Sequence, residues 1–185
     1  MHFHFGTRKI VEAAAAVLRC EPCNRMGYMR LLKLLYIADR RSLQRTGRPI
    51  VGTCPVAMKL GPVLSEVLDL VRGKHYDEAV WSEFIRKDGY EVEQRKDPGV
   101  LSLSRYEIEE LGRVSAECRE YGDSELVEKT HEFPEWKKNF VEGTSTPIPL
   151  ADIVEAVGRS ADRDEILRDA EASRALGRRL LGCGP

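Results

Sequence analysis

The chain contains no run of 18 or more apolar residues, so it lacks a conventional membrane-spanning helix. Its opening stretch, MHFHFGTRK, lacks the apolar core of a secretory signal peptide. No internal repeat or low-complexity tract interrupts the 185 residues. We therefore expect a cytoplasmic protein without a membrane partner, organised as one domain with an added terminal element.

Disulfide and metal frameworks are also missing. The five cysteines are odd in number and irregularly spaced, which argues against a set of disulfides. Cys20 and Cys23 have the spacing of a metal or redox pair, but a structural zinc site needs a second pair of ligands. Only His2 and His4 lie near them in the sequence. We expect no structural metal.

Convergent catalytic groups cannot be found in the sequence either. His75 precedes Asp77 and Glu78, and His131 precedes Glu132. Neither spacing matches a known arrangement of nucleophile, base and acid. Such residues are more often exposed groups in loops and at helix ends, so we predict that the protein is not an enzyme.

The near-neutral net charge of -1 conceals an uneven distribution. Residues 24–59 hold eight Lys or Arg against one acid, a net charge of +7, whereas residues 60–185 hold 18 basic and 27 acidic residues, a net charge of -9. The small total argues against a protein that coats nucleic acid. The asymmetry predicts a basic patch formed by the earlier segment.

The basic segment begins as a predicted helix from Arg25 to Thr46, which ends before Gly47 and Pro49. On a helical wheel its apolar side chains, including Leu32, Leu35 and Tyr36, fill one arc and predict a core face. The opposite arc is basic and consists of Arg30, Lys33, Arg40, Arg41, Arg45 and Arg48.

Two readings of the basic arc are open: a solvated face, or a surface for a partner. On the second reading the candidate partner-binding residues are Arg30, Arg40, Arg41, Arg45 and Arg48. We expect Arg41, Arg45 and Arg48 to be exposed. Reversing the charges of Arg41 and Arg45 should then leave folding intact.

Asp39 departs from this pattern because it falls within the apolar arc. A buried carboxylate without a partner is destabilising or stays protonated. We therefore expect Asp39 to accept hydrogen bonds from backbone amides or to pair with a basic residue such as Lys59.

The remaining chain predicts further helices and a small sheet. Gly61-Pro62 favours a helix over Val63 to Arg72 with the proline in its first turn. Asp88-Gly89 predicts a hairpin within residues 81–104, with VLSLS as a third strand. Ser104 and Glu107 form a capping box that opens another helix. The fold class is therefore mostly α with a small antiparallel hairpin or sheet (α+β), in a compact helical domain.

Two stretches together carry a family resemblance. LLKLLYIADRRSLQRTGRPIVG, followed by AMKLGPVLSEVLDLV, resembles the Panacea domain of SocA-like and phage GepA-like antitoxins. The later THEFPEW is similar to the family's Thr-His…Pro-Trp ending, with Glu135 as a departure. The matching family-motif residues are Lys33, Leu34, Tyr36, Gly47, Pro49, Lys59, Gly61, Pro62 and Trp136.

The resemblance covers about Arg8 to Phe140 and sets the expected organisation. Residues 1–141 would form the Panacea-like domain. Residues 142–185 would form an extension, with a linker up to Pro149 and an amphipathic helical region from Leu150.

The resemblance implies an antitoxin that binds and neutralises a toxin encoded beside it, without catalysis or a cofactor. Members of the family pair with unrelated toxins, and some relatives resemble adaptors that deliver the toxin to a protease such as a Clp-type machine. A second reading, from the residues, is a winged-helix-like DNA-binding regulator, because helices followed by a hairpin can build such a unit. The broad apolar arc and the acidic remainder of the chain argue against a nucleic-acid partner.

Overall fold

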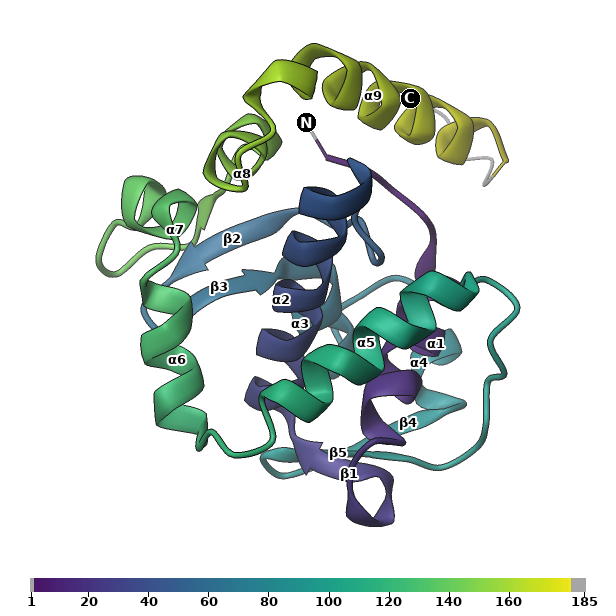
Figure 1. Ribbon diagram of the computed structural model, residues 1–185. Helices are drawn as coiled ribbons and strands as arrows, with labels where there is room; N and C mark the ends of the chain where they lie inside the picture. Colours follow the sequence, from purple (N-terminus) through teal and green to yellow (C-terminus); the bar gives the residue numbers. More distant parts are fainter. Residues whose placement is uncertain (1, 181–185) are drawn as a thin grey trace.

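Two helices form the centre of the fold (Figure 1). The computed structural model describes the backbone of residues 2–180 and the side chains of residues 2–177. Helix α1 (Thr7–Leu18) is rich in alanine and buried on nearly all sides, as expected for a helix that is apolar all round. Helix α2 (Tyr28–Thr46) packs against it. Leu32, Leu35 and Tyr36 are buried in α2, which confirms the predicted core face.

The start of the second helix was predicted too early. The 3₁₀ turn η1 (Pro22–Asn24) places Cys23 and Asn24 at positive φ, 58° and 50°. The chain then runs extended as strand β1 (Arg25–Gly27) before α2 begins at Tyr28. The two left-handed residues turn the chain back toward the sheet, which sequence periodicity alone does not reveal.

The first sheet is antiparallel, with strand order β1-β5-β4. Strands β4 (Ile85–Asp88) and β5 (Glu91–Gln94) are joined by a two-residue turn whose first residue, Gly89, has φ 60°. The predicted hairpin is confirmed. The third strand is β1, and the VLSLS segment forms a turn instead.

The second sheet has the order β3-β2-β6. It consists of β2 (Pro55–Met58), β3 (Gly61–Leu64) and the short β6 (Thr146–Pro147). Pro62 lies in the edge strand β3, where a proline is tolerated, so its predicted place in the first turn of a helix is wrong. The helix that follows, α3 (Ser65–Val71), begins three residues later.

Four further helices surround this centre: α4 (Glu78–Ser82), α5 (Arg105–Glu117), α6 (Asp123–His131) and α7 (Pro134–Asn139). The predicted capping box is present at α5, where the Glu107 N–H donates to Ser104 Oγ and the Ser104 N–H donates to Glu107 Oε2. Helices α5 and α6 both pack against α2.

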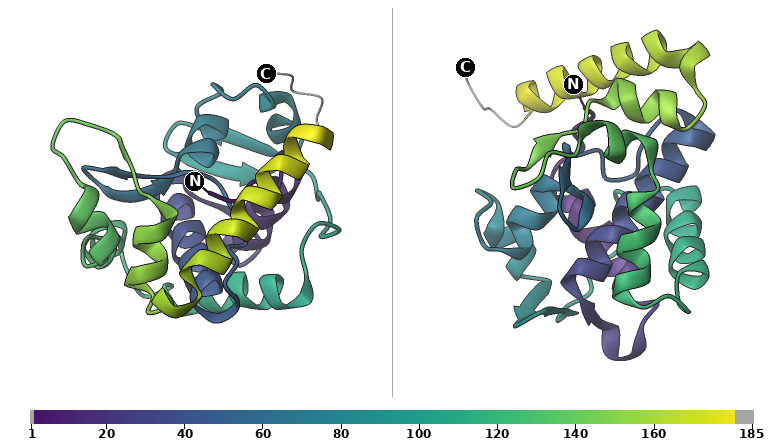
Figure 2. Two further views of the ribbon diagram at one scale, coloured as in Figure 1. Left: turned by 90° about the horizontal axis from the view of Figure 1, so that it is seen from above. Right: turned by 90° about the vertical axis from the view of Figure 1, so that its left-hand side faces the viewer.

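The carboxyl-terminal segment packs onto this body and includes α8 (Leu150–Ala156), the 3₁₀ turn η2 (Ser160–Asp162) and α9 (Arg163–Leu180). Its helical character agrees with the prediction. The expected linker, however, contains β6, and Ile148 is buried. Figures 1 and 2 show α9 lying across the amino-terminal segment. The division of the chain at residue 141 stays a prediction.

A second apolar cluster joins this segment to the rest of the protein. It brings Phe3, Leu43 and Trp136 together with Ile153 and Ile166.

The architecture as a whole is mostly helical α+β, as predicted. Within residues 2–180, no helix combines the length and apolar character needed to cross a membrane.

Candidate functional site

Lys33 lies at the centre of a cluster formed by the family-motif residues. Its predicted place on the basic face is wrong, because the side chain is only 1% exposed. The Nζ atom donates a hydrogen bond to the carbonyl oxygen of Pro62 at 2.9 Å. Burial lowers the pKa of Lys33 to about 7. This contact ties α2 to the β2–β3 hairpin.

Gly61 is required where the hairpin approaches Lys33. Its φ is 88°, a conformation that side-chain-bearing residues rarely adopt. A Cβ atom at this position would lie 2.5 Å from Thr130 Oγ1 and 2.8 Å from Lys33 Nζ. The absence of a side chain therefore lets α2, the hairpin and α6 meet at one point.

Trp136 attaches α7 to the same hairpin. Its Nε1–H donates to the carbonyl oxygen of Met58 at 3.0 Å. The ring stacks on His131, with centroids 4.1 Å apart, and on Phe140 from the other direction. The Thr-His…Pro-Trp segment thus positions side chains that hold the hairpin in place. Lys59, at the tip of the hairpin, is exposed.

Glu135 connects α7 directly to α2. It is fully buried, and its Oε1 atom accepts hydrogen bonds from the Tyr36 hydroxyl at 3.0 Å and from Arg40 Nε at 2.8 Å. The Arg40 guanidinium also lies over the Phe133 ring, 4.4 Å from its centroid. Burial, with the neighbouring Glu135 carboxylate, raises the pKa of Tyr36 well above its usual value. The residue that departs from the family pattern therefore completes the cluster.

Asp39 holds the turn that follows α2. Gly47 ends the helix with φ 77°, and its N–H donates to the carbonyl oxygen of Leu43. The Asp39 carboxylate accepts the N–H groups of residues 50, 51 and 52 at 2.9, 2.7 and 3.1 Å. Burial raises the pKa of Asp39 to about 6, although these three amide donors favour the ionised form. The predicted binding to backbone amides is confirmed, and Lys59 is not the partner.

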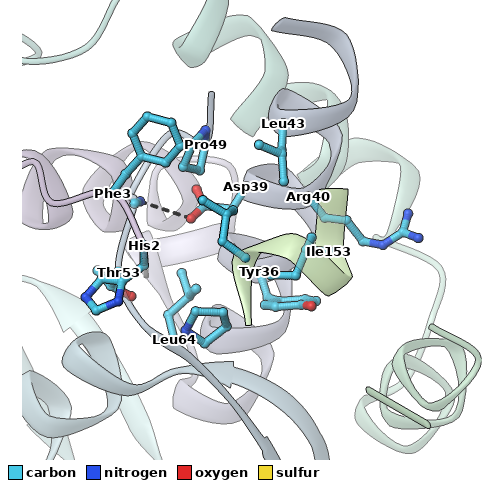
Figure 3. Close-up of a pocket in the computed structure, with 13 residues that line it drawn as sticks. His2, Phe3, Tyr36, Asp39, Arg40, Leu43, Pro49, Thr53, Leu64 and Ile153 are labelled. Carbon is cyan, nitrogen blue, oxygen red and sulfur yellow. Dashed lines mark hydrogen bonds between the residues drawn. The ribbon is translucent and has the colours of Figure 1, made fainter. Parts of the chain in front are cut away.

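A small cavity of about 30 Å³ lies beside Asp39 (Figure 3). Pro49 lines it from the turn, His2 and Phe3 from the amino-terminal segment, and Ile153 from α8. A space of this size is about that of one water molecule. It has no room for a substrate in the arrangement described.

The candidate partner-binding arginines of α2 have partners within this chain. Arg30 donates to the carbonyl oxygens of Tyr121 and Cys118. Arg45 pairs with Glu110 at 3.1 Å, and Arg48 lies 3.9 Å from Asp169. Arg40 and Arg41 pair with Glu135 and Glu117, respectively. The acidic later part of the chain therefore folds against the basic earlier part.

Exposure along this face differs from the prediction at one position. Arg45 and Arg48 are exposed, as expected, but Arg41 is half-buried. Both Arg41 and Arg45 face Glu110, whose side chain is fully buried and also pairs with Arg113. The role of the five arginines in binding a partner stays a prediction.

The polar residues considered for catalysis lie in separate local arrangements. His75 Nδ1 accepts the N–H of Asp77, and Asp77 accepts the Thr7 hydroxyl. His131 stacks on Trp136, while Glu132 pairs with Lys137. No nucleophile and base are brought together at either place among the residues that the structure describes.

Cys20 precedes η1, Cys23 lies within it, and both are free thiols. Within the described part of the chain, no three His, Cys, Asp or Glu side chains are placed to hold a metal ion. Cys183 lies outside the described residues.

The comparison with protein families decides the assignment. The model of the Antitoxin SocA-like, Panacea domain family matches residues 31–137, more than half of the chain. This chain belongs to the Panacea-domain family. No curated protein and no solved structure matches it. The matched span begins in α2 and ends in α7, so it contains the whole Lys33–Trp136 cluster of this Panacea domain.

Sequence reasoning missed two buried acids that organise the Panacea domain, Glu110 and Glu135. Both lie in helices with a mixed polar pattern, and neither has a distinctive spacing. The surplus of acids after residue 60 was the available signal, because it predicts that some of them pair with the basic segment.

Proposed function

We propose that this protein is an antitoxin, which neutralises a toxin encoded beside it by binding the toxin directly. The observation that carries the proposal is the Panacea-domain match over residues 31–137. The motif residues Lys33, Tyr36 and Trp136 support it, because their hydrogen bonds fix the positions of α2, the β2–β3 hairpin and α7. Neutralisation by binding needs such a rigid scaffold and a complementary surface.

We propose further that the protein has no enzymatic activity of its own. His75 accepts the N–H of Asp77 in its own loop, His131 stacks on Trp136 of the neighbouring helix α7, and the cavity beside Asp39 is about the size of one water molecule. The function would therefore depend on an interface. A role as an adaptor for a Clp-type protease would use the same direct contact with the toxin.

The DNA-binding alternative receives less support from the placement of the basic residues. Arg40, Arg41 and Arg45 of α2 pair with acidic side chains of this chain. Phosphate groups would have to displace these partners before the helix could contact a duplex.

Co-purification tests the proposal. The tagged protein should be expressed together with the product of the adjacent open reading frame and, as a control, with an unrelated small acidic protein. We expect the adjacent product alone to co-purify in a fixed ratio through size-exclusion chromatography. Recovery of neither protein, or of both to the same extent, would contradict the proposal.

Protein levels separate the two antitoxin mechanisms. If binding alone neutralises the toxin, its level should be the same in cells with and without the Clp-type protease. If the protein acts as an adaptor, the toxin should accumulate when the protease is deleted.

A further inference from the structure

Strand β4 is the open edge of the first sheet. It pairs with β5 on one side, and the strand order places no other strand on its second side within residues 2–180. Asp88 and Glu91 close the two-residue hairpin turn, so they form a hydrogen-bonded pair. Since such pairs alternate along antiparallel strands, Arg86 also bonds to β5. The N–H and C=O groups of Ile85 and Lys87 therefore point away from β5. Ile85 is only 1% exposed, so Lys87 provides the accessible pair.

A groove of about 600 Å³ runs beside this edge. Three consecutive residues of β4, Ile85, Arg86 and Lys87, line one wall, which places the groove against the main chain of the strand. The end of α3 and one side of α4 form the rest, and Figure 1 shows β4 beside α4. Buried apolar side chains of Trp81 and Ile85 lie at its base.

The groove carries a surplus of positive charge. Arg72, Arg86, Lys87 and Arg95 line it together with a single acid, Glu78. Arg86 and Arg95 both pair with Glu93, at 3.0 and 3.3 Å. Arg72 and Lys87 form no ion pair with any residue that the structure describes, and Lys87 lies over the Tyr28 ring. Two cations are therefore available beside outward-facing main-chain groups.

We propose that an extended, acidic segment of a partner protein adds to β4 as a fourth strand of this sheet. The outward main-chain groups of Lys87 would supply the hydrogen bonds, and side chains of the added strand would meet the cations. Arg72 and Lys87 select for carboxylates at the rim.

The same charges exclude a second copy of this chain as the occupant. Pairing β4 with β4 would bring Arg86 and Lys87 of one copy against the same residues of the other, and like charges on opposing strands are destabilising. Basic side chains at an open edge are also a common protection against unspecific pairing. Here they admit an acidic strand and repel a basic one.

The identity of the donor rests on the proposed function, under which the acidic segment belongs to the toxin. The site itself can be tested without the toxin. The probe is the acetylated and amidated pentapeptide Glu-Val-Glu-Val-Glu, with Lys-Val-Lys-Val-Lys as its matched control. Each is titrated into the ¹⁵N-labelled full chain to about 5 mM, so that binding in the millimolar range is detected.

The acidic peptide should shift the amide resonances of residues 85–88 and of Arg72 in a saturable way. It should also slow hydrogen exchange at the Lys87 amide, while the basic peptide does neither. Absence of these shifts at the highest concentration, or equal shifts with both peptides, would overturn the proposal.

Two variants test the two components of the site separately. Lys87→Pro removes an outward N–H that β5 does not use, at a position where an edge strand accepts proline. Because it also removes the ammonium group, it is compared with Lys87→Ala, which loses the charge alone, and it should bind the acidic peptide about tenfold more weakly than Lys87→Ala. Arg72→Glu with Lys87→Glu should abolish binding of the acidic peptide and permit binding of the basic one. Arg105→Glu, at the exposed first residue of α5, is the control and should change neither affinity. Unchanged affinity in both groove variants would overturn the proposal.

The toxin then distinguishes this site from the proposed function. If the wild-type chain and both groove variants bind the adjacent gene product equally, the toxin is not the donor of the acidic segment and the antitoxin proposal stands. If the acidic peptide binds β4 but the adjacent product does not bind the chain, the site stands and the antitoxin proposal fails.

Discussion

The Lys33 amine and the Pro62 carbonyl oxygen lie 2.9 Å apart, in hydrogen-bonding contact, within the protein interior. No described residue supplies an acidic partner to this amine, and its burial lowers the pKa of Lys33 to about 7. The contact links the long central helix to the Gly-Pro hairpin. Lys33, which the sequence pattern placed on a basic surface, is therefore part of the protein interior.

Lys33→Met should change how stability depends on pH. Since the folded-state pKa of Lys33, about 7, lies below the ordinary value of 10.5, the unfolded chain binds one more proton between these values. The free energy of unfolding of the wild type should gain up to about 1.4 kcal/mol per pH unit from this group as pH rises through that window. Urea titrations from pH 7 to 10 should show this contribution missing in Lys33→Met. Parallel pH profiles for the two proteins would contradict the lowered pKa of the buried Lys33 amine.

Gly61→Ala should destabilise the protein more than Gly89→Ala. Both glycines have positive φ, 88° and 60°. A Cβ at Gly61 would meet Thr130 Oγ1 at 2.5 Å, whereas one at Gly89 has nothing within 4 Å. Both variants therefore include backbone strain, and the first adds overpacking, with an extra cost of about 1–3 kcal/mol. Equal midpoints in urea for the two variants would show that the Lys33–Gly61–Thr130 contact is looser than described.

Asp39→Ala should destabilise the turn after α2. It would leave the N–H groups of residues 50–52 without their acceptor, and each buried, unsatisfied donor costs about 1–3 kcal/mol. We expect a loss of about 3 kcal/mol or more in the free energy of unfolding, measured by chemical denaturation. Asp88→Ala, at the exposed hairpin turn, is the control and should cost little. A loss no larger than that of the control would contradict this role of Asp39.

Reversing Arg41 and Arg45 together to Glu should destabilise the fold, contrary to the expectation from sequence alone. Both guanidinium groups face the buried carboxylate of Glu110. Replacing its partners by acids leaves a buried charge poorly compensated, which we expect to cost about 3 kcal/mol. Thermal and urea unfolding should show this loss. The control variant, Arg72→Glu with Lys74→Glu, lies in the acidic part of the chain and should show no loss. Wild-type stability in the first variant would show that Arg113 alone satisfies Glu110.

These comparisons also show what sequence patterns could predict. Local signals were reliable where one or two residues determine the geometry: Ser104 with Glu107 formed the capping box, and Gly89 formed the hairpin turn. The apolar arc of α2 gave the correct core residues. Pro62 misled, because a proline suits both a first helical turn and an edge strand, and only tertiary pairing with Ala57 decides between them.

The candidate site depended on long-range contacts that periodicity cannot supply. Lys33 lies at the margin of the basic arc on a helical wheel, yet the hairpin and α6 cover it. The family resemblance singled out Lys33, Tyr36 and Trp136, but it did not indicate that their side chains form contacts in the interior. The charge asymmetry predicted a basic patch, but Arg40, Arg41 and Arg45 of that patch pair with acidic side chains of the same chain.

The most direct test of the antitoxin account is a growth measurement in cells that carry two separately inducible plasmids. One expresses the adjacent open reading frame, and the other expresses this protein or its Lys33→Met and Arg105→Glu variants. We predict that the adjacent product alone arrests growth, and that the wild-type protein and Arg105→Glu restore it as their level reaches that of the toxin. If the adjacent product does not arrest growth, or if it does and the wild-type protein fails to relieve the arrest, the account is contradicted.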